Sequence, residues 1–150
     1  MWFCANMLAL NEIKTKYIII WPSHMRPNLA QFNITINGIQ LDRIGNDCYE
    51  QCCKFLGIHI DENLTWKYHI NQVCKKVSRA LFSIKQVKRA LPTDCLKTLY
   101  YALVHSHFAY GIITWGNANN CILKPLVTLQ KRAIHVIHNA HYNSHTEPKF

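Results

Sequence analysis

Hydrophobic and polar positions change their period near residue 66. Before that point, apolar residues alternate with polar ones in short runs, which is the period of a β-strand. Beyond it, apolar residues recur every three or four positions, which is the period of an amphipathic helix. The pattern predicts an α+β fold: a short helix over residues 2–10, a small antiparallel β-meander within residues 1–66, and a three-helix unit over residues 67–150.

Short runs in the first part predict its strands. The run Tyr17–Trp21 is β-branched and aromatic, as strands commonly are. Two alternating runs flank Asn37-Gly38, and this pair favours a type I′ hairpin turn because both central residues need a positive φ. Residues 53–60 predict a third strand with Gly57 in its interior, which is typical of a bulge or of a close approach by another backbone.

The first helix of the second part is predicted over residues 68–91 and has clearly separated faces. Its apolar arc consists of Ile70, Val73, Cys74, Val77, Leu81 and Ile84. The opposite arc and its flanks carry Lys75, Lys76, Arg79, Lys85 and Gln86. We therefore expect the apolar arc to face a core, and the cations to face solvent or a partner.

Two further helices follow this one. Pro92 is expected to end the first helix, and Thr93 or Asp94 to cap the second. The second helix carries the apolar residues Leu96, Leu99, Tyr100 and Leu103. The third helix, over residues 122–138, directs inward Leu126, Ala133, Ile134 and Ile137, and directs outward Lys124, Lys131 and Arg132.

Charge is divided unequally between the two parts. Hydrophobic residues make up 49% of the chain, enough to bury a core, and the net charge is +9. Residues 1–66 hold five Lys/Arg against six Asp/Glu, whereas residues 67–150 hold twelve against two. The second part is therefore the one expected to meet an anionic partner.

Cysteines and histidines do not form a recognisable metal site. The seven cysteines include no CxxC pair, and the cluster Cys48, Cys52 and Cys53 has no second pair at zinc-finger spacing. The later histidines run into an Asn/Ser-rich tail: His105, His107, His135, His138, His141 and His145. We expect no bound metal. Because the N-terminus lacks a signal-peptide pattern, we expect reduced thiols in an intracellular protein, nuclear or cytoplasmic.

The sequence lacks the motifs of several enzyme classes. It contains no glycine-rich phosphate loop and no GxSxG or HExxH motif. Residues 98–123 carry no charge, but His105–His107 and Gly111 interrupt them, so we expect a buried helix rather than a membrane span. The acidic pair Asp61-Glu62 is expected to act at a helix N-terminus rather than to bind a metal.

Four stretches resemble one enzyme family in order and spacing. WFCANMLALNEIKTKYIII (2–20) and CKFLGIHIDENLTWKYHI (53–70) are similar to consecutive segments of reverse transcriptases from LINE-type (non-LTR) retrotransposons. LYYALVHSHFAYGIITWG (99–116) and LQKRAIHVIHNAHYNSHTEP (129–148) are similar to the thumb region of the Jockey-like branch of that family. Taken together, the resemblance covers essentially the whole chain.

The resemblance implies a place within such an enzyme, namely the end of the palm, the primer grip and the thumb. Lys14 matches a lysine thought to assist pyrophosphate departure, and Phe55, Leu56 and Gly57 match the primer grip. The [FY]-x-DD motif, which binds the catalytic Mg²⁺ in that family, does not occur in this sequence. The resemblance thus implies a fragment whose missing partners are the parent palm and fingers, and which has no cofactor of its own.

Resemblance and charge indicate the same partner, an RNA–DNA or DNA duplex held through its phosphates. Cations on one helical face bind a duplex by displacing its counterions, with little readout of base sequence. The candidate nucleic-acid-binding residues are Lys75, Lys76, Arg79, Lys85, Lys131 and Arg132. No membrane partner is expected.

Two other interpretations remain open from the sequence. One is a free-standing RNA- or DNA-binding module. The other is a structural remnant without an enzymatic role, whose basic face is a solvated surface. Salt-dependent binding to a primer–template duplex is expected for the reverse-transcriptase fragment and for the free-standing module, but not for the structural remnant.

We predict that these 150 residues alone synthesise no DNA on a primed RNA template with Mg²⁺ or Mn²⁺. Phosphoryl transfer by two metal ions needs converging carboxylates, and the motif that supplies them is not in the sequence. The measurement is incorporation of labelled nucleotide. Incorporation that persists through stringent repurification would contradict the prediction.

Overall fold

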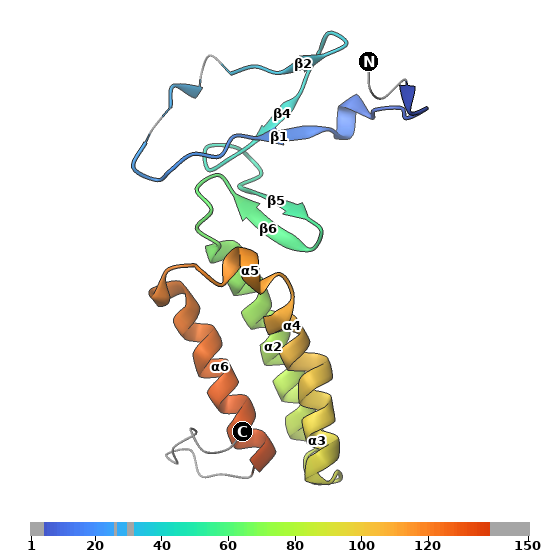
Figure 1. Ribbon diagram of the computed structural model, residues 1–150, viewed down its shortest axis with the longest axis vertical. Helices are drawn as coiled ribbons and strands as arrows, with labels where there is room; N and C mark the ends of the chain where they lie inside the picture. Colours follow the sequence, from blue (N-terminus) through green and yellow to red (C-terminus); the bar gives the residue numbers. More distant parts are fainter. Residues whose placement is uncertain (1–4, 26, 30–31, 139–150) are drawn as a thin grey trace. The chain divides into compact units, whose positions relative to one another are not determined.

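The computed structural model describes residues 5–25, 27–29 and 32–138 (Figure 1). Strands lie in the first part of the chain and long helices in the second, so the predicted α+β class is confirmed. The chain divides into two compact units, unit 1 (Met1–Thr65) and unit 2 (Trp66–Phe150).

Unit 1 is built from short elements. They are η1 (Glu12–Lys14), a 3-10 helix, and the strands β1 (Lys16–Ile18), β2 (Thr35–Ile36), β3 (Ile39–Gln40), β4 (Asp42–Ile44), β5 (Cys52–Phe55) and β6 (Ile58–Asp61). Among the described residues the strands form three separate pairs: β2–β3 and β5–β6 are antiparallel, whereas β1 and β4 are parallel. The meander expected from the sequence is therefore limited to two hairpins.

The start of unit 1 is less regular than its sequence pattern predicts. Residues 2–4 of the predicted helix lie outside the described residues, and residues 8–10 are not helical. Met7 and Leu8 are exposed, so no packed face supports a helix there, and short helices depend on such packing. The strand predicted from Tyr17 ends at Ile18.

Both hairpins of unit 1 turn through two residues with positive φ. In the β2–β3 turn, φ is 50° at Asn37 and 81° at Gly38, which confirms the predicted hairpin. In the β5–β6 turn, φ is 45° at Leu56 and 83° at Gly57. The single strand predicted over residues 53–60 is therefore wrong. Gly57 sits in a turn that reverses the chain, not inside a strand.

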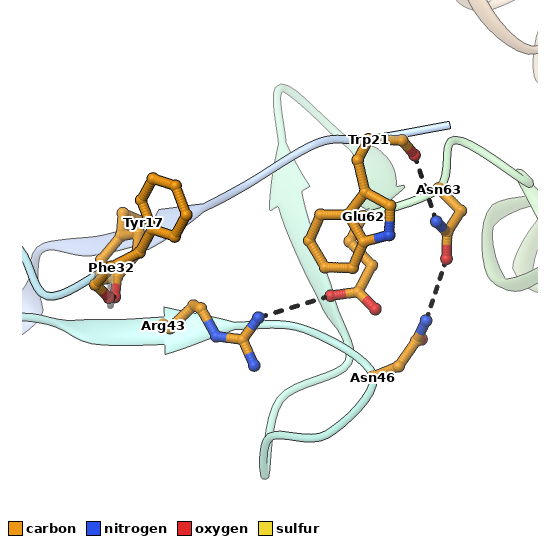
Figure 2. A network of polar contacts seen from close by, with 7 residues as sticks. All are labelled: Tyr17, Trp21, Phe32, Arg43, Asn46, Glu62 and Asn63. Atoms are coloured by element: carbon orange, nitrogen blue, oxygen red, sulfur yellow. Dashed lines mark hydrogen bonds and ion pairs between the residues drawn. The ribbon is translucent and has the colours of Figure 1, made fainter. Parts of the chain in front are cut away.

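A polar network links β4 of unit 1 to the residues after β6 (Figure 2). The Arg43 guanidinium lies 3.9 Å from the Glu62 carboxylate, and the Glu62 side chain is only 3% exposed. The Trp21 backbone N–H donates to the Glu62 carbonyl. Asn63 donates to the Trp21 carbonyl and accepts from Asn46, each at 3.2 Å. These contacts join three segments that are distant in the sequence.

The acidic pair has a role different from the one expected. Asp61 Oδ2 accepts the Thr65 backbone N–H at 2.9 Å, and this bond shapes the loop after β6. Glu62 pairs with Arg43 instead of facing a helix. The following helix begins only at Lys67, and its N-cap, Trp66, makes no side-chain cap hydrogen bond. The first turn of this helix contains no Asp or Glu.

The long helices of unit 2 pack side by side (Figure 1). Its elements are α2 (Lys67–Val87), α3 (Thr93–Tyr100), the π-helical turn η3 (Tyr101–His105), α4 (Ser106–Ala109), α5 (Ile112–Trp115) and α6 (Asn120–His138). Grooves shared near the N-terminal ends and near the C-terminal ends of α2 and α6 show that these two helices run parallel.

The ends of these helices follow the local sequence. Helix α2 ends at Val87, earlier than the predicted residue 91, and a turn follows in which the Ala90 backbone N–H donates to the Val87 carbonyl. The N-cap of α3 is Pro92, and no side chain caps this helix, so the predicted cap by Thr93 or Asp94 is wrong. Asp94 instead lies 3.7 Å from Lys97 in the first turn.

The core of unit 2 is formed where its helices meet. Val77, Val104 and Ala133 come from different elements, and each is 0% exposed. The predicted apolar arc of α2 is confirmed, since Ile70, Val73, Val77, Leu81 and Ile84 are buried and Cys74 is half-buried. The predicted inward residues of α6 are likewise buried: Leu126, Ala133, Ile134 and Ile137.

The π-helical turn η3 changes which residues of the stretch α3–η3–α4 face the core. Among the apolar residues of the predicted second helix, Leu96 and Tyr100 are buried and Leu99 is half-buried, but Leu103 is 41% exposed and Val104 is buried in its place. A π turn inserts one extra residue into the helix, so the inward position moves one residue along the chain. Within the described part of the chain, no helix is long and apolar enough to cross a membrane.

We predict that Gly38→Val weakens the β2–β3 hairpin. Nothing lies within 4 Å of a Cβ added at Gly38, so the cost comes from the backbone alone, where φ is +81°. A β-branched residue in that conformation costs about 1–2 kcal/mol. Gly38→Asn is the control, because Asn tolerates a left-handed backbone. The measurement is amide hydrogen exchange of Thr35–Gln40, and equal protection in the two variants would contradict the prediction.

We predict that Glu62→Gln destabilises unit 1 by about 3 kcal/mol, because it leaves the Arg43 guanidinium buried beside an uncharged group. Hydrogen exchange of β4 and β6 measures the loss. Glu50→Gln is the matched control, since it removes a carboxylate from the exposed Lys16–Glu50 ion pair and should leave the exchange rates unchanged. Equal exchange rates in the two variants would show that the buried pair does not stabilise unit 1.

Candidate nucleic-acid interface

The surface of unit 2 concentrates positive charge on α2 and α6. All six predicted cations are exposed: Lys75, Lys76, Arg79, Lys85, Lys131 and Arg132. Neither helix contains an Asp or Glu residue. Burial of the apolar arcs leaves these side chains no other direction, so the helices present cations without local neutralisation.

The cations of α2 point to different sides of the helix. Lys75 and Arg79 are one turn apart and lie opposite the buried Val77. Lys76 lies on the side of α4, where burial lowers the pKa of His107 and the Lys76 charge lowers it further. His107 is therefore neutral at physiological pH, and the positive charge on this side comes from Lys76.

Lys85 and Arg132 lie on the two walls of one groove between α2 and α6, which we call the α2–α6 groove. It has a volume of about 440 Å³ and is mainly apolar. Its lining residues are Ser78, Leu81, Phe82, Lys85, Leu129, Arg132, His135 and Val136. Lys131 faces away from this groove, on the outer side of α6.

A second groove lies nearer the N-terminal ends of the same two helices. It is lined by Lys67, Ile70, Asn71, Cys74, Cys121, Ile122 and Pro125. Burial raises the pKa of Cys74, so its thiol stays protonated and uncharged near neutral pH. Lys67 is the cation of this groove.

The predicted site residues of unit 1 lie at its surface. Lys14 is exposed at the end of η1, where its backbone N–H donates to the Asn11 side chain at 3.1 Å. Phe55, Leu56 and Gly57 form the tip of the β5–β6 hairpin, with Phe55 60% and Leu56 74% exposed. The turn brings these three residues together and presents two large apolar side chains to solvent.

Metal ligands are not brought together in the part of the chain that the structure describes. Within residues 5–25, 27–29 and 32–138, no group of three His, Cys, Asp or Glu side chains is placed to hold an ion. Cys52 Sγ lies 3.9 Å from His59 Nδ1, and burial raises the pKa of this thiol. His141 and His145 lie outside the described residues.

The sequence analysis did not identify two residues of the α2–α6 groove, Phe82 and His135. Phe82 is 64% exposed, although it belongs to a helix whose apolar arc is buried. Its signal in the sequence was a large apolar residue standing outside that arc. His135 was expected to be solvated or to face phosphate rather than to bind a metal, and its place beside Arg132 follows from the packing of α6 on α2.

Comparisons with protein-family models, with curated proteins and with solved structures find no match for this chain.

Proposed function

We propose that unit 2 binds an RNA–DNA or DNA duplex through its phosphates, as the thumb-like part of a non-LTR reverse transcriptase. The observation that carries the proposal is the acid-free pair of helices α2 and α6, which exposes eight cations on a packed helical core, the six predicted ones together with Lys67 and Lys124. The four family-like stretches of the sequence support the same assignment.

The physical basis is counterion release. A duplex carries a dense array of phosphates, and each Lys or Arg that contacts one displaces a condensed cation. Such contacts position a protein on a duplex without reading its sequence. An RNA–DNA hybrid offers mainly shape and backbone to a protein, which suits a surface of lysines and arginines.

Unit 1 contributes to the proposal through its exposed hairpin. The tip formed by Phe55, Leu56 and Gly57 is the segment that resembles the primer grip. A glycine at such a tip lets a nucleic-acid backbone approach closely, because it has no side chain. In the separate stretch around η1, the family resemblance makes Lys14 the candidate for contact with departing pyrophosphate.

Polymerisation itself is assigned to the parent enzyme. The Mg²⁺ ions of such an enzyme would be held by palm carboxylates that this sequence does not contain. The adjacent carboxylates Asp61 and Glu62 do not fit that role, since Glu62 pairs with Arg43 and Asp61 accepts from Thr65. The proposal therefore places duplex binding, and no chemical step, on these residues.

A free-standing nucleic-acid-binding module is the second candidate. It is favoured by one observation: the core of unit 2 is built entirely from residues of that unit. Thermal unfolding of the isolated chain separates the two candidates. A cooperative transition favours the module, whereas failure to fold without the parent palm favours the fragment.

We predict that the double substitution Lys75→Gln and Arg79→Gln flattens the salt dependence of duplex binding. Each phosphate contact adds about 0.9 to the slope of log affinity against log salt on B-DNA, so the slope should fall by roughly 1–2 units. Binding should weaken evenly across sequences. The measurement is a salt titration of hybrid binding by fluorescence anisotropy.

The control removes the same charge elsewhere, with Lys16→Gln and Lys97→Gln. Lys16 and Lys97 lie near Glu50 and Asp94, and neither is on α2 or α6. The control should keep the wild-type slope. If both doubly substituted proteins are folded and share one slope, the cations of α2 do not contact phosphates.

A further inference from the structure

The α2–α6 groove combines an exposed aromatic ring with cations on both walls. Phe82 is 64% exposed, and Lys85 follows it by one turn on the same side of α2. Arg132 lies on the opposite wall, contributed by α6. Because neither helix has a carboxylate, no side chain of α2 or α6 neutralises these two cations.

This groove adjoins the cations proposed to hold the duplex. Arg79 precedes Phe82 by three residues, so the two side chains are neighbours on the surface of α2. A strand that leaves the end of a duplex bound at Lys75 and Arg79 would therefore reach Phe82 next. Leu81, Leu129 and Val136 add an apolar lining to the same groove.

We propose that the α2–α6 groove binds an unpaired nucleobase next to the duplex, with the Phe82 ring stacked on the base and Lys85 and Arg132 on the flanking phosphates. This inference rests on the proposed function. A base inside a duplex has both faces covered by its neighbours, so a phenyl ring can stack only on an unpaired base or on the outer face of a terminal pair. An unpaired base reaches a groove in the helix surface more readily than the terminal pair of a rigid duplex does. Aromatic rings set among cations are the usual means of binding single strands without sequence preference.

The test compares a blunt RNA–DNA hybrid with the same hybrid carrying a four-nucleotide single-stranded overhang. The wild-type chain should bind the overhang form about 5-fold or more tighter, the gain expected from stacking one base. Phe82→Leu keeps an apolar side chain but removes the ring, and should abolish this preference. Phe82→Trp should restore it. Circular dichroism checks that both variants are folded, which is expected because Phe82 is exposed.

The double variant Lys75→Gln and Arg79→Gln separates this inference from the function on which it rests. It should weaken binding of both hybrids equally and leave their ratio unchanged. Salt-dependent binding of the blunt hybrid with no preference for the overhang, in wild type and Phe82→Leu alike, would overturn the groove assignment and leave the proposed function intact. No salt-dependent binding to either hybrid would overturn both.

A different occupant gives a different result. If an acidic amphipathic peptide binds the chain, loses affinity in Phe82→Leu and leaves the overhang ratio at one, the groove is a protein-docking site and the nucleobase assignment is wrong. Crosslinking of an iodouracil in the overhang to Phe82 or its neighbours, but not of the same base placed inside the duplex, would support the assignment.

Discussion

Burial of the apolar arc of α2 is the constraint on which the organisation of unit 2 depends. Val77 is fully buried where α2 meets Val104 and Ala133, and the small size of these residues lets the helices approach closely. Once that arc is buried, each cation of the helix has only the outer face or the flanks available. The electrostatics of the surface are therefore a consequence of apolar packing. Unit 1 lacks such an arc and instead relies on a buried ion pair and two hairpin turns.

The sequence predicted best the elements whose side chains repeat over several turns. The arc of α2 repeats over 21 residues, and its buried positions were identified correctly. Between α3 and α4, the π turn η3 interrupts the helical period, so Val104 is buried in place of Leu103. The spacing of apolar residues in the sequence does not indicate this turn. The Leu56-Gly57 turn was missed because leucine rarely takes a positive φ. The parallel pairing of β1 with β4 depends on tertiary contacts that short strands do not encode locally.

The sequence also predicted some features of the candidate site and missed others. Exposure of the six cations followed from helical spacing alone, because a residue opposite a buried arc has to face solvent. Which cations share a groove did not follow, since Lys85 and Arg132 belong to different helices that meet only through the packing of α6 on α2. Phe82 was missed for a related reason. A single apolar residue on a polar face is common, and only the neighbouring helix turns it into part of a groove.

The parallel course of α2 and α6 has an electrostatic consequence of its own. Each helix carries about half a unit of partial positive charge at its N-terminus and the same amount of negative charge at its C-terminus, and parallel helices place like ends together. Lys85 stands in the last turn of α2, so part of its charge offsets the negative end of that helix's macrodipole. At the other end, near Lys67 and Asn120, the macrodipoles themselves attract anions. The potential along the helix pair is therefore more uniform than the positions of its lysines and arginines suggest.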